Sequence, residues 1–219
     1  MRKLVSAEIE KIEVAIRAKM AYELSMAYHL FWVEDAHLFT SSHNHTTTLD
    51  KVSEEYMRSS EEFISAFKNK YSNPLPPAHI ILEITSFGTL SRLYRNLKPN
   101  KAKRDVAKSF NLPDKVFDAW LHSLTCVRNV CAHHARLWNS QIKIQPLSPK
   151  KPQDIWLTNN AVCNNRVYYI LSMIIYLLNA INPTHTFKQK LHHLFEKYPN
   201  VDKSAMGFPV DWQNEPLWQ

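Results

Sequence analysis

The scarcity of glycine is the strongest constraint on how this chain can fold. Only 2 glycines, Gly88 and Gly207, occur in 219 residues. Tight turns between strands often need a residue with positive φ, which glycine adopts at the least cost. The sequence therefore excludes a β-sandwich, a β-barrel and a glycine-rich nucleotide cradle. Hydrophobic residues make up 45% of the chain and aromatic residues 11%, which is ample material for a folded core.

Apolar residues recur at steps of three and four along most of the chain, the pattern of amphipathic helices. This pattern predicts an all-α fold, a bundle of about six or seven helices in one domain over residues 1–219. The expected helices cover residues 5–32, 50–73, 77–97, 101–110, 113–138, 160–181 and 184–198. Prolines in 139–159 predict an internal loop with at most a short strand at 141–145, and residues 199–219 are expected to form a tail packed on the bundle.

The polar segment 40–48 contains the only HxH pair, His43 and His45. No cysteine or acidic residue accompanies the pair within this segment. A metal site normally needs such further ligands. We therefore expect a solvated loop there, and no metal or cofactor in the protein.

The cysteine count and the hydropathy pattern bear on where the protein works. The three cysteines form no CxxC pair, which favours a reducing compartment, and acidic residues come too early for a signal peptide. The most apolar stretch, 168–181, is too short to cross a bilayer. We expect a cytoplasmic protein with no membrane contact. Its net charge of +7 points toward an anionic partner, although charge alone fits nucleic acid, a membrane surface or no partner.

One stripe on the expected helix 113–138 carries polar residues but no lysine or glutamate. Its members are His122, Thr125, Asn129, His133 and Arg136. Solvated helix faces are usually rich in lysine and glutamate, whereas these residue types bind phosphate and transfer protons. The alternative interpretation is that His133 and His134 only pack or cap near a helix end.

Arg128 lies on the same expected helix, five residues before His133. On a regular helix their side chains diverge by roughly 140°. A single helix therefore cannot direct both side chains toward the same point. A two-fold contact between two copies would bring two arginines and two histidines into one cleft, so we expect a homodimer.

Four segments resemble a known family. Arg128 to His133, with Asn129 after the arginine, matches the R-x4-6-H motif of HEPN-domain ribonucleases. The chain is similar to one branch of that superfamily, the Abi-like (AbiD/AbiF) abortive infection proteins of bacteria. The segments that carry this resemblance are 10–17, 86–97, 127–139 and 206–212. Family members usually have another helical, aromatic-rich segment ahead of the first helix, so this chain resembles an N-terminally short member.

The resemblance implies a HEPN-like bundle and a metal-independent RNA endonuclease of antiphage defence. His133 would be base or acid toward the ribose 2′-OH and the leaving 5′-oxygen, Arg128 would bind phosphate, and Asn129 would orient the imidazole or bind oxygen. The expected products are a 2′,3′-cyclic phosphate and a 5′-hydroxyl. His134 and Arg136 are expected to support the site, and Glu83, expected in a buried helix, could pair with Arg128.

A basic segment is the expected contact for the RNA backbone, the alternative being a plain solvated face. Its residues are Arg92, Arg95, Lys98, Lys101, Lys103, Arg104 and Lys108, with Asp105 as the single acid. The resemblance leaves open a non-catalytic protein that clasps a structured or non-coding RNA, and an interaction module. Expected partners are RNA and a second copy, with a regulatory non-coding RNA or an antitoxin, as in toxin–antitoxin systems, as further candidates.

Overall fold

The computed structural model describes residues 1–219, and its regular elements are all helices, without a strand. Nine α-helices and four short 3-10 helices replace the expected six or seven helices, so the all-α prediction is confirmed and the helix count is higher. The α-helices are α1 (Arg2–Ala27), α2 (Ser42–Arg58), α3 (Glu62–Lys70), α4 (Ala78–Ile84), α5 (Phe87–Asn96), α6 (Lys101–Lys108), α7 (Asp114–Ala132), α8 (Val167–Ile181) and α9 (Phe187–Lys197).

Residue contacts divide the chain into two compact units. Unit 1 contains Met1–Val14 and Ala107–Gln219, and unit 2 contains Ala15–Val106. The single-domain organisation stays a prediction. We describe each unit by itself.

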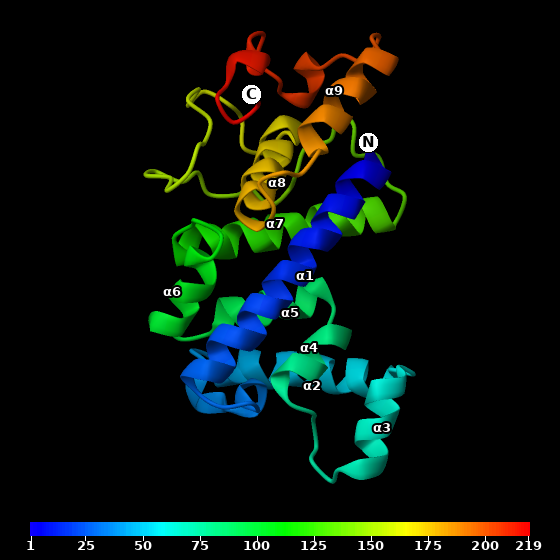
Figure 1. Cartoon of the computed structure of the whole chain (residues 1–219), viewed down its shortest axis with the longest axis vertical. Helices are drawn as coiled ribbons and strands as arrows, with labels where there is room; N and C mark the ends of the chain where they lie inside the picture. The colour runs from blue at the N-terminus through cyan, green and yellow to red at the C-terminus, as the bar shows by residue number, and fades with distance from the viewer. The chain divides into compact units, whose positions relative to one another are not determined.

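In unit 2, α2 packs against α4 and α5 (Figure 1). The start of α2 is tied to the end of α5, because an antiparallel bridge joins Phe39 to Leu97. The Ser41 side chain caps α2 by accepting from the Asn44 N–H at 3.2 Å. This cap places most of the segment 40–48 on a helix, so the expected loop there is wrong.

Three further boundaries in unit 2 differ from expectation. The helix expected over 50–73 is divided at residues 59–61 into α2 and α3. The helix expected over 77–97 is split, because the Ser86 side chain caps a new helix, α5, by accepting from the Thr89 N–H at 3.3 Å. The first helix ends at Ala27 instead of continuing to Trp32. Trp32 belongs to a separate 3-10 turn, Trp32–Glu34, and is fully buried.

Unit 1 is organised around aromatic residues that hold α7. Trp120 of α7 meets the Tyr176 ring of α8 edge-on at 5.5 Å and the Trp156 ring at 5.0 Å. The Trp120 indole N–H also donates to the Leu147 carbonyl at 2.7 Å. The segment between α7 and α8 therefore packs on α7 through specific side chains, although it contains no strand and α8 begins only at Val167.

The last residues of unit 1 form an aromatic cluster with α8. Trp218 stacks on Tyr168 at 5.3 Å, and its indole N–H donates to the Ser172 hydroxyl at 3.0 Å. Gly207 has a φ of 85°, and a Cβ there would lie 2.5 Å from the Arg166 Cβ. Glycine is therefore required at this turn by both backbone conformation and space.

No α-helix of the chain combines the length and the apolar character that crossing a bilayer demands.

Candidate functional site

The C-terminus of α7 is closed by a Schellman turn in which His133 is the cap and His134 is left-handed. The His134 N–H donates to the Cys131 carbonyl at 3.3 Å, and the Ala135 N–H donates to the Val130 carbonyl at 3.0 Å. His134 has a φ of 55°, a conformation that glycine usually supplies at this position. The expected continuation of this helix to Trp138 is therefore wrong.

The motif residues share this helix end. The His133 N–H donates to the Asn129 carbonyl at 2.9 Å, so His133 keeps a helical position one turn after Asn129. Arg128, Asn129 and His133 are all exposed. Their side chains make no hydrogen bond or ion pair with other residues of unit 1, which leaves their polar groups available to a ligand.

The polar stripe is shorter than predicted. Arg136 is exposed but lies beyond the helix, so it does not continue the line of Asn129 and His133. The Thr125 hydroxyl donates to the Leu121 carbonyl at 2.9 Å, which satisfies its proton within the helix. The alternative interpretation of the histidines is correct in one respect, because the backbone of His133 caps α7.

Arg2 fixes the turn that carries His133. Its guanidinium donates to the His134 carbonyl and, at 3.2 Å, to the Ala135 carbonyl. A cation at these carbonyls also interacts favourably with the helix dipole. Arg2, His134, Arg136 and Trp138 line an open depression of about 390 Å³ beside the turn. Sequence patterns had no means of finding Arg2, which lies 132 residues from its partner.

The cysteine thiols of α7 are not activated. Burial raises the pKa of Cys126, and burial outweighs the nearby Arg2 charge to raise the pKa of Cys131. Both therefore remain thiols at neutral pH, whereas the nucleophilic form of cysteine is the thiolate. Among the polar side chains of this helix end, those of histidine, asparagine and arginine are the ones suited to proton transfer and phosphate binding.

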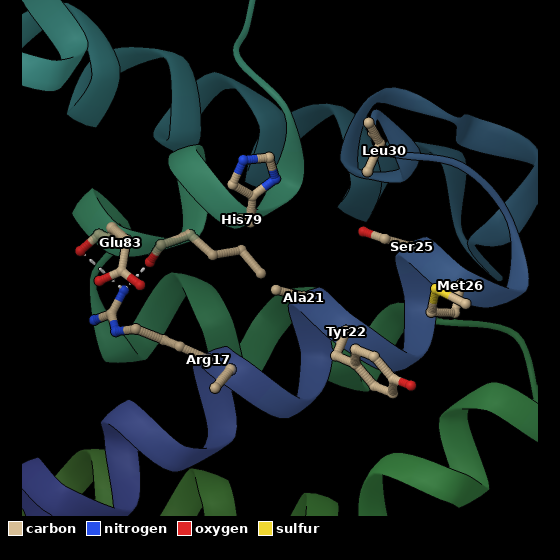
Figure 2. A pocket seen from close by; sticks show the side chains of 10 residues that line it. Arg17, Ala21, Tyr22, Ser25, Met26, Leu30, His79 and Glu83 are labelled. Carbon is tan, nitrogen blue, oxygen red and sulfur yellow. Dashed lines mark hydrogen bonds between the residues drawn. The ribbon is translucent and has the colours of Figure 1, made fainter.

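Glu83, expected in a buried helix, is exposed, and that expectation is wrong. It lies at a pocket of about 370 Å³ on unit 2, where Figure 2 shows it beside Arg17. The Arg17 guanidinium donates to the Leu82 carbonyl and, at 3.3 Å, to the Glu83 carbonyl. Arg17 thereby satisfies carbonyls at the end of α4. The pairing of Glu83 with Arg128 stays a prediction.

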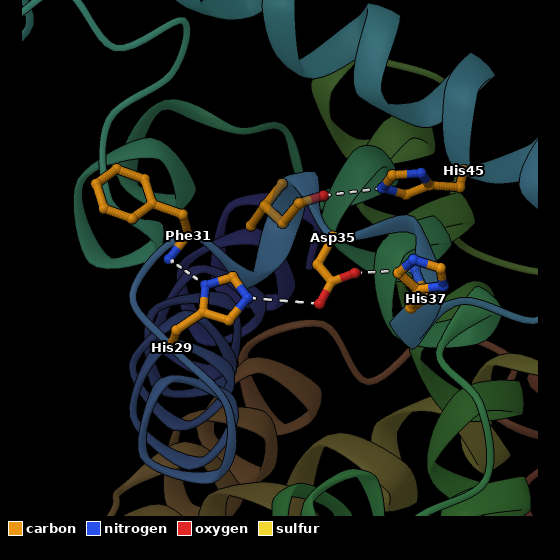
Figure 3. Close-up of polar contacts among 6 residues, drawn as sticks. His29, Phe31, Asp35, His37 and His45 are labelled. Carbon is orange, nitrogen blue, oxygen red and sulfur yellow. Dashed lines mark hydrogen bonds and ion pairs between the residues drawn. The ribbon is translucent and has the colours of Figure 1, made fainter.

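The two histidines of the HxH pair have different environments. His43 is exposed, whereas His45 is buried and stacks on Phe39 at 4.2 Å. The His45 Nε2 lies 2.9 Å from the Val33 carbonyl (Figure 3). The same view shows the contact between His29 and Asp35, whose Nε2 and Oδ2 atoms lie 3.5 Å apart. No group of three or more metal-ligating side chains occurs in the chain.

Most of the basic segment is exposed. The exposed members are Arg92, Arg95, Lys98, Lys101, Arg104 and Lys108. Arg92 and Arg95 line a pocket of about 450 Å³ at the start of α2. Lys101 forms an ion pair with Asp105 at 2.6 Å.

Lys103 does not belong to this exposed surface, which corrects its predicted RNA contact. It is 8% exposed, and its ammonium donates to the Arg95 carbonyl at 3.1 Å and the Leu97 carbonyl at 2.9 Å. The ammonium also lies 5.1 Å from the centre of the Tyr94 ring. Lys103 therefore caps the C-terminus of α5.

The family model for Abi-like proteins matches residues 1–139, more than half of the chain. An all-helical protein with these motif residues on an exposed helix end fits that class, and the chain belongs to the Abi-like family. The family associates it with abortive infection, a response to phage. The match includes Arg128, Asn129 and His133. Neither the curated proteins nor the solved structures contain a match to this chain.

Proposed function

We propose that this protein is a HEPN-type, metal-independent RNA endonuclease that acts in the bacterial cytoplasm during abortive infection. The observation that carries the proposal is the common exposure of Arg128, Asn129 and His133 at one helix end, with their side chains unengaged. These three residue types supply proton transfer and phosphate binding. Family membership adds the association with phage defence.

The proposed reaction is a transesterification within RNA. His133 takes the proton of a ribose 2′-OH, and the 2′-oxygen attacks the adjacent phosphorus. The bond from phosphorus to the 5′-oxygen breaks, and that oxygen receives a proton from an acid. The products are a 2′,3′-cyclic phosphate and a 5′-hydroxyl. Arg128 stabilises the charge that develops on the phosphoryl oxygens.

A two-fold dimer completes the proposed site. His133 keeps its helical position through its bond to Asn129, so its side chain and that of Arg128 point roughly 140° apart. A second copy across a two-fold axis would supply a histidine and an arginine from the other side. One His133 then serves as base and its mate as acid.

The second candidate function is RNA binding without cleavage. The bound partner would then be a non-coding RNA that occupies the protein, or an antitoxin that regulates it. It is favoured by the exposed cations of α5 and α6, which require no chemistry at His133. One experiment distinguishes RNA cleavage from RNA binding alone.

That experiment measures cleavage of a labelled RNA in the presence of a metal chelator. His133→Ala should abolish cleavage and keep RNA affinity, because the imidazole supplies proton transfer and little binding. His43→Ala is the matched control, since His43 is also exposed on a helix. Sedimentation at the assay concentration should show a dimer. Cleavage that survives His133→Ala, or that a strictly monomeric protein performs, would contradict this mechanism.

A further inference from the structure

Trp138 is the one tryptophan of the chain whose indole is not buried. It is 37% exposed, whereas none of the five others is more than 9% exposed. The four other tryptophans of unit 1 all take part in ring contacts, and Trp138 does not. Tryptophan has a large apolar surface, and burial is its usual environment. The exposed indole of Trp138 is therefore free to contact a flat ligand.

A turn with a buried first residue presents Trp138 at the surface. Leu137 is buried, and its carbonyl accepts from the Ser140 N–H at 3.2 Å and from the Ser140 hydroxyl at 2.7 Å. Asn139 has a φ of 50°, in the left-handed region that asparagine tolerates. The backbone of Trp138 is thus held between two restrained residues before any ligand binds. This preorganisation lowers the ordering cost of binding.

The depression of about 390 Å³ that Trp138 lines is cationic. Arg2, His134 and Arg136 also line it, and no acidic residue does. The Arg136 side chain is exposed and makes no hydrogen bond or ion pair with other residues of unit 1. The two acceptors of the Arg2 guanidinium are carbonyls, which carry no negative charge to neutralise it. These cations favour an anionic ligand, and a guanidinium matches the geometry of a phosphate group.

The depression adjoins the residue that we propose to act in proton transfer. His134, which lines the depression, directly follows His133, and Arg2 binds the His134 carbonyl. Neighbouring nucleotides of an RNA strand are joined through one phosphate. A nucleotide in the depression can therefore be the direct neighbour of the one that is cleaved at His133.

We propose that this depression is a base-stacking subsite for RNA. One nucleotide beside the cleaved bond places its base on the Trp138 indole and its phosphate on Arg136. Every base has an aromatic face, so the subsite accepts any base. A second copy of the chain carries the same cations and is a poorer match to this depression. The inference rests on the proposed function in taking RNA as the ligand, and it concerns binding rather than chemistry at His133.

The test measures binding of a short fluorescent oligoribonucleotide to His133→Ala protein, in which cleavage does not interfere. Trp138→Leu should weaken binding about fivefold or more, because leucine is apolar but has no aromatic face. Trp138→Phe should keep most of the affinity. Tyr198→Leu is the matched control, because Tyr198 is an exposed aromatic residue of unit 1 outside the depression.

A second ligand separates the base contact from the phosphate contact. A strand of abasic units keeps the phosphates and lacks the bases, so Trp138→Leu should leave its affinity unchanged. Arg136→Gln should weaken binding of both strands and lower the slope of log affinity against log salt by about 0.7. Arg58→Gln is the control for charge, because it makes the same change at an exposed arginine of unit 2.

The outcomes separate this proposal from the nuclease. If Trp138→Leu weakens RNA binding no more than Tyr198→Leu, or weakens binding of the abasic strand equally, the subsite is overturned even where His133-dependent cleavage persists. If the variants behave as expected and wild-type protein never cleaves, the nuclease fails and the subsite stands.

Sedimentation and thermal unfolding of each variant complete the test. If Trp138→Leu dissociates a dimer, Trp138 belongs to an interface between copies, and the subsite is overturned as well. Trp138→Gln replaces Trp138→Leu in both binding comparisons if the leucine variant does not fold.

Discussion

The Arg2 guanidinium donates to the main-chain oxygen of His134. This bond holds in place the turn that directly follows His133. Both residues lie in unit 1, at the start of α1 and just after α7. The helix end therefore depends on a contact from a distant part of the sequence. Arg2 thereby restrains the turn that follows the residue we propose to act in proton transfer.

Replacing Arg2 should weaken this helix end. Arg2→Gln removes a cation from the final carbonyls of α7, and we expect a loss of about 0.3–1 kcal/mol in the free energy of unfolding. RNA cleavage should fall as well, because the turn that presents His133 is less restrained. Urea unfolding and the cleavage assay measure the two effects. Lys3→Gln, a change of the same charge at an exposed neighbour, should alter neither.

Position 134 should tolerate only residues that adopt positive φ. His134→Val should lower the free energy of unfolding by about 1–2 kcal/mol, because a β-branched residue is disfavoured in the left-handed region. His134→Asn should be close to neutral, since asparagine enters this region readily. Chemical unfolding of the two variants checks this. Equal stability of both would contradict the described turn.

Lys103 and Lys101 provide a contrast between a structural and a solvated lysine. Lys103→Met leaves two carbonyls at the end of α5 without their donor, and should cost about 1–3 kcal/mol in the free energy of unfolding. Lys101→Met breaks only an exposed pair with Asp105 and should change stability little. Denaturant titration of both variants measures the difference. A larger loss for Lys101→Met would show that the burial assigned to Lys103 is incorrect.

His185 should make stability depend on pH. Its pKa is lowered, first by burial and then by the charge of Lys188. The His185 Nδ1 accepts from the Phe187 N–H at 3.2 Å, and its Nε2 donates to the Asn179 side-chain oxygen at 2.8 Å, so the neutral ring satisfies both partners. In the unfolded chain the histidine takes up a proton near its ordinary pKa of about 6.5.

The direction of the effect follows from proton linkage. Below about pH 6.5 the unfolded chain binds more protons than the folded one, so the free energy of unfolding falls as the pH is lowered from about 7.5 to about 5.5. Urea titrations at the two pH values measure this. His185→Gln should reduce the difference, and His193→Gln, at an exposed position, should leave it unchanged.

Local patterns predicted the buried faces better than the ends of helices. Trp120, Leu124 and Val127 of α7 are buried as their helical spacing predicts. The end of α7 was missed because residue 134 is neither glycine nor proline, and the alanine, arginine and leucine that follow are good helix formers. The turn depends instead on His134 accepting positive φ and on Arg2.

Charge was also an uncertain guide to exposure. Lys103 lies within a basic run, and nothing in that run distinguishes it from Lys101. Its burial depends on the carbonyls that α5 presents to it after folding. His45 is similar, because its polar neighbours predict a loop, while stacking on Phe39 makes it part of the core. Tertiary contacts of this kind leave no local periodicity.

The carboxylate of Glu215 accepts from the Thr158 N–H and hydroxyl at 2.8 and 2.9 Å, and from the Asn159 N–H at 2.9 Å. Thr158 precedes Glu215 by 57 residues. During synthesis, these three donors therefore lack their carboxylate acceptor until Glu215 has emerged from the ribosome. Contacts between residues so distant in sequence form late and slow folding. The segment that covers Trp120 would reach its final conformation only once Glu215 has been made, well after α7 itself.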